Sequence, residues 1–432
     1  LETRTLLTGL TIIAHGQASS AGTWVSSMAN ATAQRVTPKG DVAQYTLTVT
    51  GTDKAIFASS PVLDAGSKPW NATTSGEAIV KIDWSELTKG PLANYPTTQD
   101  IAAQVFAKLR VFSVAGLSSL SVPLHLIGHS RGASLLTELS RLLGETGNWI
   151  EQFSMLDPNN SVHAVQYNPF DRDIVPKVYE NVIFADNYYQ QTPGVFDVSG
   201  IHIDGAYSIR LRGLGGEGYP HEHSDTHLWY HGTIDTDGPV DDGATDEDYE
   251  QVSDDGADWY DDQQGPRENT GYYFSRVGGG YSQRPQQGLM AGFATSSGAH
   301  REKLPTGNQV WPNVAIDRAN VNMPSSLAAG KKLTVPFRYA DAGSSLTATV
   351  FLDRDRNPFN LGKYDLKQIP LEGKNTSPQL DVTNTYMPTI LNKQGGVWYA
   401  AVRVTDPSGR IRYVYLDTPI TLIPSKAVEQ RL

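Results

Sequence analysis

A turn signal between an apolar strand and an amphipathic helix constrains the fold of this chain more than any other feature. Gly128-His129-Ser130-Arg131-Gly132 follows the apolar run Leu124–Ile127 and precedes Ala133–Leu143, whose leucines recur with the period of a helix packed on a sheet. Gly144 is expected to end that helix. Glycine stands two residues before and two residues after the central serine because a side chain at 128 or 132 would collide with the neighbouring strand or helix. The pattern predicts a nucleophile, Ser130, at a strand-to-helix turn; the alternative is an ordinary glycine-rich turn.

The segments around this turn alternate between strand and helix patterns. Such alternation predicts the α/β class, with a mostly parallel sheet covered by helices on both faces. Helices are expected over Ser20–Asn30 and Thr97–Val111, the latter capped by Thr97 or Thr98. The expected strands are Leu10–Ala14, Glu77–Trp84, Leu124–Ile127, Glu151–Leu156 and Val178–Ala185, with a hairpin formed by Ala43–Gly51 and Lys54–Ser60.

After about Pro305 the helix patterns cease. From Val314 to Pro424 only alternating strands separated by Gly, Pro, Asn and Asp turns are expected, namely Leu333–Tyr339, Leu346–Leu352, Gly396–Thr405 and Ile411–Leu416. This texture predicts a separate all-β domain of immunoglobulin-like sandwich type. The expected organisation is therefore an α/β-hydrolase catalytic domain over residues 1–305 and an accessory β-sandwich over residues 312–432.

Charge and composition narrow the classes of partner. The net charge is −11, and the acidic insert Asp235–Asp262 alone contributes −13, from 11 Asp and 2 Glu without Lys or Arg, so the remainder is +2. Without a basic stripe, nucleic acid is not an expected partner. No run approaches the roughly 20 apolar residues of a membrane span. The chain has no cysteine, which excludes disulfides and thiolate sites, and its first residues show no signal-peptide pattern.

A serine nucleophile needs a base that is oriented by an acid. Two acids are candidates: Asp157, which follows the strand ending at Leu156, and Asp186, which follows Ala185 and is expected to end the next strand. Carboxyl ends of parallel strands are where catalytic groups gather. The base candidates are His223 and His227. Ser224 is a good N-cap, so His223 is expected on a loop tip and His227 inside the following helix.

The oxyanion hole is expected from backbone amides. His15-Gly16-Gln17 follows the first strong strand and is expected to lie beside the serine turn, so the N–H groups of Gln17 and Arg131 are the candidate donors. No metal ligand is assigned, since His221-Glu222-His223 is shorter than the helical HExxH zinc motif. No cofactor is expected. The carboxylates of the acidic insert suit a structural Ca²⁺, but a solvated lid or loop is the preferred interpretation. Asp353–Asn357 starts like a calcium loop and is interpreted as a hairpin turn, because Pro358 stands where such loops have Gly.

The segment from His15 to Tyr230 resembles α/β-hydrolase lipases and esterases. Gly128-His129-Ser130-Arg131-Gly132 followed by Leu156-Asp157-Pro158 is similar to the chlorophyllase and platelet-activating-factor acetylhydrolase branch, and to pancreatic-type lipases. In those groups the acid follows the strand after the nucleophile helix, which favours Asp157. His223-Ser224-Asp225 fits the catalytic-histidine loop of chlorophyllase-like enzymes, which favours His223.

This resemblance covers about half the chain. It departs from chlorophyllase-like sequences at the hairpin and at the acidic insert, so their substrate is not carried over. It implies a secreted or periplasmic bacterial ester hydrolase, an esterase or lipase. The substrate that it implies is an ester or a lipid, and a polymeric ester is one of the alternatives. Two other functions remain open: a serine amidase or peptidase on the same fold, and a non-catalytic hydrolase-like binding or adhesin protein.

Overall fold

A computed structural model divides the chain into two compact units. One comprises Thr8–Gly307, and the other comprises Asn308–Leu432 with Leu1–Leu7. The two are described separately. The structure describes residues 9–37, 41–52, 55–71, 75–88, 96–114, 117–159, 173–191, 198–215, 218–237, 241–243, 257–260, 266–285, 301–305, 313–316, 324–328, 331–341, 345–356, 358, 361–371, 375–386, 395–407, 411–416 and 418–423.

The first unit is built on a largely parallel sheet, as the sequence predicts. Its strands run in the order β11-β10-β9-β8-β1-β5-β2-β3, and β4 pairs with β2. All neighbours from β11 to β2 are parallel, whereas β3 and β4 are antiparallel to β2. The strands are β1 (Leu10–Ala14), β2 (Asp41–Thr52), β3 (Ala55–Ala58), β4 (Val62–Leu63), β5 (Ser75–Asp83), β8 (Leu124–His129), β9 (Ile150–Leu156), β10 (Val182–Tyr189) and β11 (Tyr207–Arg210).

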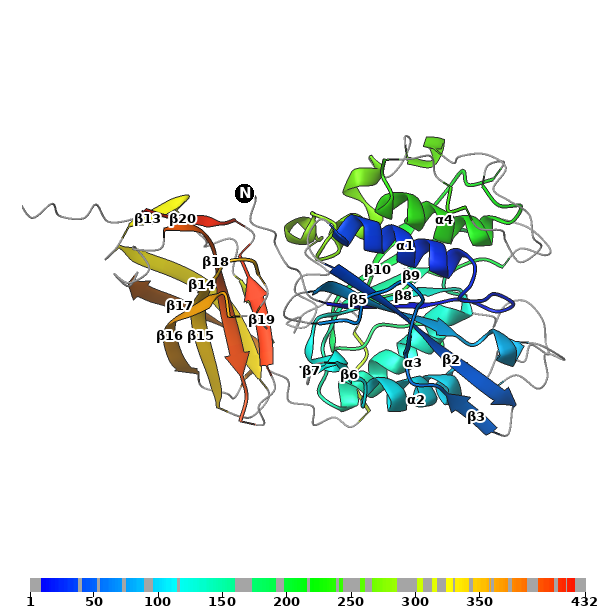
Figure 1. Cartoon of the computed structure of the whole chain (residues 1–432), viewed down its shortest axis with the longest axis horizontal. Coiled ribbons are helices and arrows are strands. Elements are labelled where there is room, and N and C mark those ends of the chain that lie inside the picture. The colour runs from blue at the N-terminus through cyan, green and yellow to red at the C-terminus, as the bar shows by residue number, and fades with distance from the viewer. Residues whose placement is uncertain are drawn as a thin grey trace, which may run out of the picture. The chain divides into compact units, whose positions relative to one another are not determined.

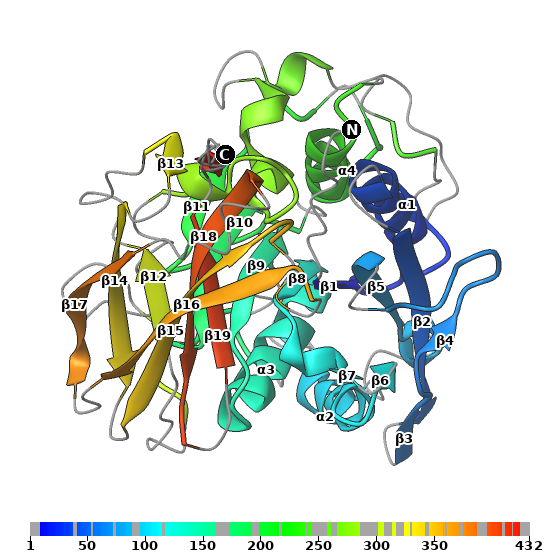
Figure 2. The ribbon, with the colours of Figure 1, turned by 60° about the vertical axis from the view of Figure 1, so that its left-hand side comes forward.

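Helices cover both faces of this sheet, which confirms the α/β class. Helices α1 (Trp24–Val36) and α4 (Glu222–Ile234) lie on one face, while α2 (Thr98–Leu109) and α3 (Arg131–Glu145) lie on the other (Figures 1 and 2). The central strands β1, β8, β9 and β10 are buried along their whole length, as strands covered on both faces should be. The remaining short elements are β6 (Ser113–Val114), β7 (Leu117–Ser118) and the 3₁₀ turns Ser85–Thr88, Ser119–Ser121, Ala257–Tyr260, Arg267–Asn269, Gly271–Phe274 and Tyr281–Gln283.

Several expected elements are confirmed and several boundaries were wrong. Strand β1 has the predicted bounds, and β2 with β3 forms the expected hairpin. Thr97 caps α2, because its side chain accepts a hydrogen bond from the Asp100 N–H at 3.2 Å. Helix α1 lies several residues later than expected. Helix α3 ends with Thr146 as its C-cap rather than at Gly144.

In the described part of the second unit, all regular elements are β-strands. Three strands form the sheet β12-β14-β17, and six form the sheet β13-β20-β18-β15-β16 with β19 paired to β18. Buried apolar side chains from both sheets form one cluster, including Phe337, Val350 and Val402. An immunoglobulin-like relationship stays a prediction. The strands are β12 (Asn313–Ile316), β13 (Ser326–Ala328), β14 (Lys332–Asp341), β15 (Leu346–Asp353), β16 (Lys363–Leu371), β17 (Asn375–Tyr386), β18 (Gly396–Thr405), β19 (Ile411–Tyr415) and β20 (Ile420–Ile423).

Two charged segments singled out in the sequence have different outcomes. Asp353 ends β15, which pairs antiparallel with β16, so the segment that begins there connects a hairpin as expected. Most of the acidic insert, residues 238–240, 244–256 and 261–262, lies outside the described residues. Within the described part of the chain, no helix is long and apolar enough to span a membrane.

Candidate active site

Ser130 occupies the strained turn between β8 and α3. Its φ of 54° and ψ of −127° are uncommon for a residue with a side chain. The turn is held because the Ser130 N–H donates to the Leu156 carbonyl at 2.9 Å and the flanking glycines leave no space for a Cβ. A Cβ on Gly132 would lie 2.5 Å from the His15 carbonyl oxygen, and one on Gly128 would lie 2.8 Å from the Gly132 carbonyl oxygen. Asp157 also has a positive φ, of 44°, and backbone strain of this kind gathers at functional sites.

His223 and Asp157 form a hydrogen-bonded pair. His223 Nδ1 lies 2.6 Å from Asp157 Oδ2. Because a carboxylate only accepts, Nδ1 of His223 is the donor, and in the neutral imidazole this assignment leaves the lone pair on Nε2. Asp157 is fully buried and also accepts from the backbone N–H and the side-chain amide of Gln190, both at 2.9 Å. The imidazole is therefore oriented by an acid that is itself held by two further donors, both from Gln190.

This pair lies next to the serine turn. His129, the residue before Ser130, contacts the His223 ring with a centroid distance of 4.5 Å, and its Nε2 lies 2.9 Å from the His223 carbonyl oxygen. Since a carbonyl accepts, His129 Nε2 is the donor. Burial, followed by the charges of His223 and His227, holds the pKa of His129 well below its usual range. His129 is thus a neutral side chain that fastens the first turn of α4 to the end of β8.

The alternative acid has a different environment. Asp186 does not end its strand, as the sequence suggested, but lies within β10. It is fully buried and accepts from Ser154 Oγ at 2.7 Å, Tyr188 Oη at 3.1 Å and Gln152 Nε2 at 3.1 Å. Burial raises its pKa to about 6. None of these contacts joins Asp186 to a histidine, so the structure brings His223 together with Asp157 instead.

The expected position of the base also needs correction. Helix α4 begins at Glu222 with His221 as its N-cap, so His223 lies in the first helical turn rather than on a loop tip, and Ser224 is not the cap. His227 follows one turn later, stacked on Trp24 with a ring distance of 4.4 Å. Its Nδ1 has no hydrogen-bond partner among the described residues, and burial holds its pKa well below the usual range. His227 is a buried neutral ring that packs against Trp24 and His129.

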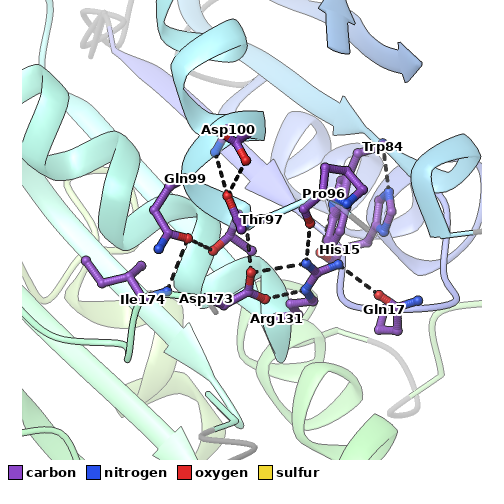
Figure 3. Close-up of polar contacts among 11 residues, drawn as sticks. His15, Gln17, Trp84, Pro96, Thr97, Gln99, Asp100, Arg131, Asp173 and Ile174 are labelled. Atoms are coloured by element: carbon purple, nitrogen blue, oxygen red, sulfur yellow. Dashed lines mark hydrogen bonds and ion pairs between the residues drawn. The ribbon is translucent and has the colours of Figure 1, made fainter. Parts of the chain in front are cut away.

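The His15-Gly16-Gln17 loop contacts the serine turn as expected. A Cβ on Gly16 would lie 2.8 Å from Ser130 Cβ and 3.3 Å from Ser130 Oγ, so only glycine fits there. His15 Nε2 accepts from the Trp84 N–H at 3.2 Å, which leaves the proton on Nδ1 to donate to the Gly16 carbonyl at 2.8 Å. Since the peptide bond is trans, the Gln17 N–H points away from that carbonyl and hence away from His15 Nδ1. Figure 3 shows His15 of this loop beside Trp84, the residue that follows β5.

Arg131, the other candidate donor, is the first residue of α3. The N–H groups of the first helical turn have no partner within the helix and favour negative charge. For metals, no group of three or more His, Cys, Asp or Glu suited to an ion occurs in the part of the chain that the structure describes. The expectation of no cofactor, and the preference for a solvated lid or loop over a calcium site in the acidic insert, stay predictions.

Sequence reasoning missed Gln190, His129 and Trp84 as parts of the site. Gln190 directly follows β10, the parallel neighbour of the strand that ends at Leu156. The carboxyl ends of adjacent parallel strands meet at one edge of a sheet, so the position of Gln190 was a usable signal. His129 and Trp84 carried no comparable signal, because their roles depend on contacts with residues far away in the sequence.

Comparisons with known proteins leave the family open. No protein-family model matches the chain, and no curated protein matches it. A putative cell surface hydrolase from Lactobacillus plantarum WCFS1 aligns in structure at 15% identity and a TM-score of 0.29, covering 48% of this chain and 83% of that one. The CARDB domain of the PF1109 protein from Pyrococcus furiosus aligns at 12% identity and a TM-score of 0.18, and the alignment covers 26% of this chain and 89% of that domain's chain. A beta-glucosidase from Listeria innocua aligns at 10% identity and a TM-score of 0.17, and the alignment covers 26% of this chain and 16% of the glucosidase chain. At these scores the site must be argued from its own geometry.

Proposed function

We propose that this chain is a serine carboxylic ester hydrolase, an esterase or lipase, that works through a Ser-His-Asp triad and an acyl-enzyme. The observation that carries the proposal is the 2.6 Å hydrogen bond between His223 Nδ1 and Asp157, formed next to the strained turn of Ser130. This bond leaves the lone pair on His223 Nε2, the nitrogen that a general base uses. Strain at Ser130 and glycine-only contacts around it support its role as the nucleophile.

In the proposed reaction His223 Nε2 takes the proton of the Ser130 hydroxyl as Oγ attacks the ester carbonyl. The carbonyl oxygen becomes an oxyanion, which accepts from the backbone N–H groups of Gln17 and Arg131. Collapse of this intermediate breaks the ester bond, and the proton on His223 passes to the leaving alcohol. Water then attacks the acyl-enzyme with His223 as base again, releasing the acid and restoring Ser130. Asp157 stabilises the imidazolium that forms in each half of the cycle.

The cellular location and the substrate class are proposed from the resemblance to α/β-hydrolase lipases and esterases. A secreted or periplasmic location and an ester or lipid substrate remain part of the proposal. Amides follow the same chemistry and are the rival substrate class, so both classes belong in one test.

The test is hydrolysis of p-nitrophenyl esters from acetyl to palmitoyl by the wild type and by Ser130→Ala, with matched p-nitroanilides in parallel. We expect ester turnover that falls by roughly 10³-fold or more in the variant, because the acyl-enzyme route is lost. The chain-length profile separates an esterase from a lipase. Turnover of anilides alone would move the assignment to an amidase. Equal ester turnover in both proteins, or none in either, would contradict the proposed function.

A further inference from the structure

The side chain of Arg131 connects three separate segments beside the proposed oxyanion hole. Its guanidinium forms a forked ion pair with Asp173 through Nε and Nη2, the latter at 3.1 Å from Oδ1. Nη2 also donates to the Pro96 carbonyl at 2.6 Å, and Nη1 donates to Gln17 Oε1 at 3.1 Å. Figure 3 shows the guanidinium between Asp173, Pro96 and Gln17.

These contacts leave the guanidinium with a structural rather than a substrate-binding task. The side chains of Arg131 and Asp173 are each 6% exposed, so the charges neutralise each other away from water. The guanidinium also lies over the ring of Trp84, 5.2 Å from its centroid. Its forked geometry is matched by a carboxylate on one side and by two carbonyl-type oxygens on the other. A lysine ammonium could not make this set of directed bonds.

Asp173 extends the connection to α2. Its Oδ1 accepts from the backbone N–H of Thr98, the first residue of α2, at 2.8 Å. The guanidinium of Arg131, the first residue of α3, thus contacts the segment before α2 through Pro96, the segment of Asp173 and the loop of Gln17. These three segments belong to separate stretches of the sequence.

Gln17 is the partner with chemical consequence. Its backbone N–H is the proposed oxyanion donor, and the next residue, Ala18, has φ of 56°, an uncommon conformation for a residue with a Cβ. His15 Nδ1 holds the Gly16 carbonyl, at one end of the Gly16–Gln17 peptide, at 2.8 Å. Arg131 holds the Gln17 side chain on the other side of the same peptide. The donor is therefore held at both ends of a locally strained turn.

We infer that Arg131 is a positioning residue, whose guanidinium fixes the Gln17 backbone N–H in the geometry that stabilises the oxyanion. The inference rests on the proposed function and adds to it a role for a side chain that does not touch the substrate. A preorganised donor acts on the transition state more than on the bound substrate, so the effect should appear in kcat and not in KM.

Gln17→Met tests this directly, because it keeps the backbone N–H and the Arg131–Asp173 pair but removes the amide oxygen. We expect kcat to fall about tenfold with little change in KM, a part of the roughly 100- to 1000-fold loss caused by removing one oxyanion donor altogether. Inhibition by an aryl boronic acid, whose tetrahedral serine adduct places an oxygen in the same hole, should weaken in parallel. The unfolding temperature should stay close to that of the wild type.

Arg131→Met should lower kcat further and also lower the unfolding temperature, because Asp173 is left buried without its partner. The double variant Arg131→Met with Asp173→Asn removes both charges and should recover the unfolding temperature but not kcat. Arg141→Met is the matched control, since Arg141 lies on the same helix and pairs with Glu138 and Glu145 instead. Its kcat should equal that of the wild type.

The outcomes separate the inference from the proposed function. Ester turnover that is absent from the wild type, or that survives Ser130→Ala, would refute both. Turnover that requires Ser130 but is as fast in Gln17→Met as in the wild type would overturn the positioning role alone. Recovery of kcat together with the unfolding temperature in the double variant would also overturn it, because stability would then explain the loss.

Discussion

The two candidate acids, Asp157 and Asp186, differ in their hydrogen-bond partners. Asp157 accepts from His223 and Gln190 and is fully buried, so its charge is directed at the imidazole. Asp186, an equally buried carboxyl, is instead satisfied by Ser154, Gln152 and Tyr188. The contrast allows a direct comparison of two carboxylates in one protein.

Asp157→Asn should lower kcat by roughly 10³- to 10⁴-fold, because an amide in place of the carboxylate no longer stabilises the imidazolium and favours the wrong tautomer of His223. Asp186→Asn should leave kcat within about threefold of the wild type, since its partners are polar groups of the sheet and not the base. Steady-state kinetics on one ester measures both. A larger loss for Asp186→Asn, in a variant that remains folded, would assign the acid to Asp186.

The elements show where sequence reasoning succeeds and where it fails. The strand-turn-helix around Ser130 was predictable because glycine spacing and leucine periodicity are local signals. Asp186 was placed at a strand end because the apolar run stops at Ala185, yet β10 continues through Tyr189. Two of the polar partners that permit this, Gln152 and Ser154, come from β9 and are distant in the sequence, which no local pattern can show.

The start of α4 illustrates a second limit. Capping preferences selected Ser224, whereas the helix begins at Glu222 after His221, which makes no side-chain cap bond. Glu222 lies in the first turn, where a negative charge interacts favourably with the helix dipole, whereas burial raises the pKa of Asp225 in the same turn to about 8. A tertiary contact also holds this turn, because His129 Nε2 donates to the His223 carbonyl at 2.9 Å. The rule for caps was sound, but tertiary contacts outweighed it.

At the junction of β1, β8 and α3 the close approach of the elements should govern stability. A Cβ on Gly132 would lie 2.5 Å from the carbonyl oxygen of His15 and 2.6 Å from that of Ala14, the last residue of β1, and backbone atoms cannot move aside as a side chain does. Gly132→Ala should therefore destabilise the fold by about 1–3 kcal/mol in urea unfolding. Gly22→Ala is the control, because its Cβ would meet only Ser20 Oγ at 3.7 Å. Equal stability of the two variants would contradict this packing argument.

For the molecule as a whole, buried acids link the stability of the first unit to pH. Glu77 lines a cavity of about 20 Å³ with Thr11, His125 and Arg276 at the strand starts, the sheet edge opposite Ser130. Burial raises the pKa of Glu77 from 4.5 to about 8, opposed by the hydrogen bond from Thr11 and the charge of Arg276. Folding therefore retains a proton that the unfolded chain releases above pH 4.5.

The stability contributed by neutral Glu77 is fully present below pH 4.5 and is lost as pH rises to about 8. Its loss amounts to at most about 1.4 kcal/mol per pH unit within that window. Glu77→Gln should remove this dependence, because the amide stays neutral at every pH. Urea unfolding of both proteins at several pH values measures the difference, in which the opposite contribution of His125 cancels. Parallel curves for the two proteins would show that Glu77 is ionised in the fold.

The division of the chain into two compact units predicts that the first unit folds and is active without the second. Ser130, His223, Asp157 and Gln17 all lie in the unit Thr8–Gly307, which should therefore fold and act without the second unit. A chain of residues 8–307 should keep kcat/KM for a soluble ester within about threefold of the full chain.

The boundary of that chain matters because residues near its end belong to the fold. The Glu302 N–H donates to the Val178 carbonyl at 2.9 Å, and the Glu180 N–H donates to the Glu302 carbonyl at 3.0 Å, while Leu304 is buried. A chain of residues 8–300 lacks these bonds and should unfold at a lower temperature than 8–307. Thermal unfolding and ester turnover of both truncations test the argument together. If 8–307 is unfolded or inactive while the full chain is active, the strand-only unit is required for folding the site and not merely attached to it.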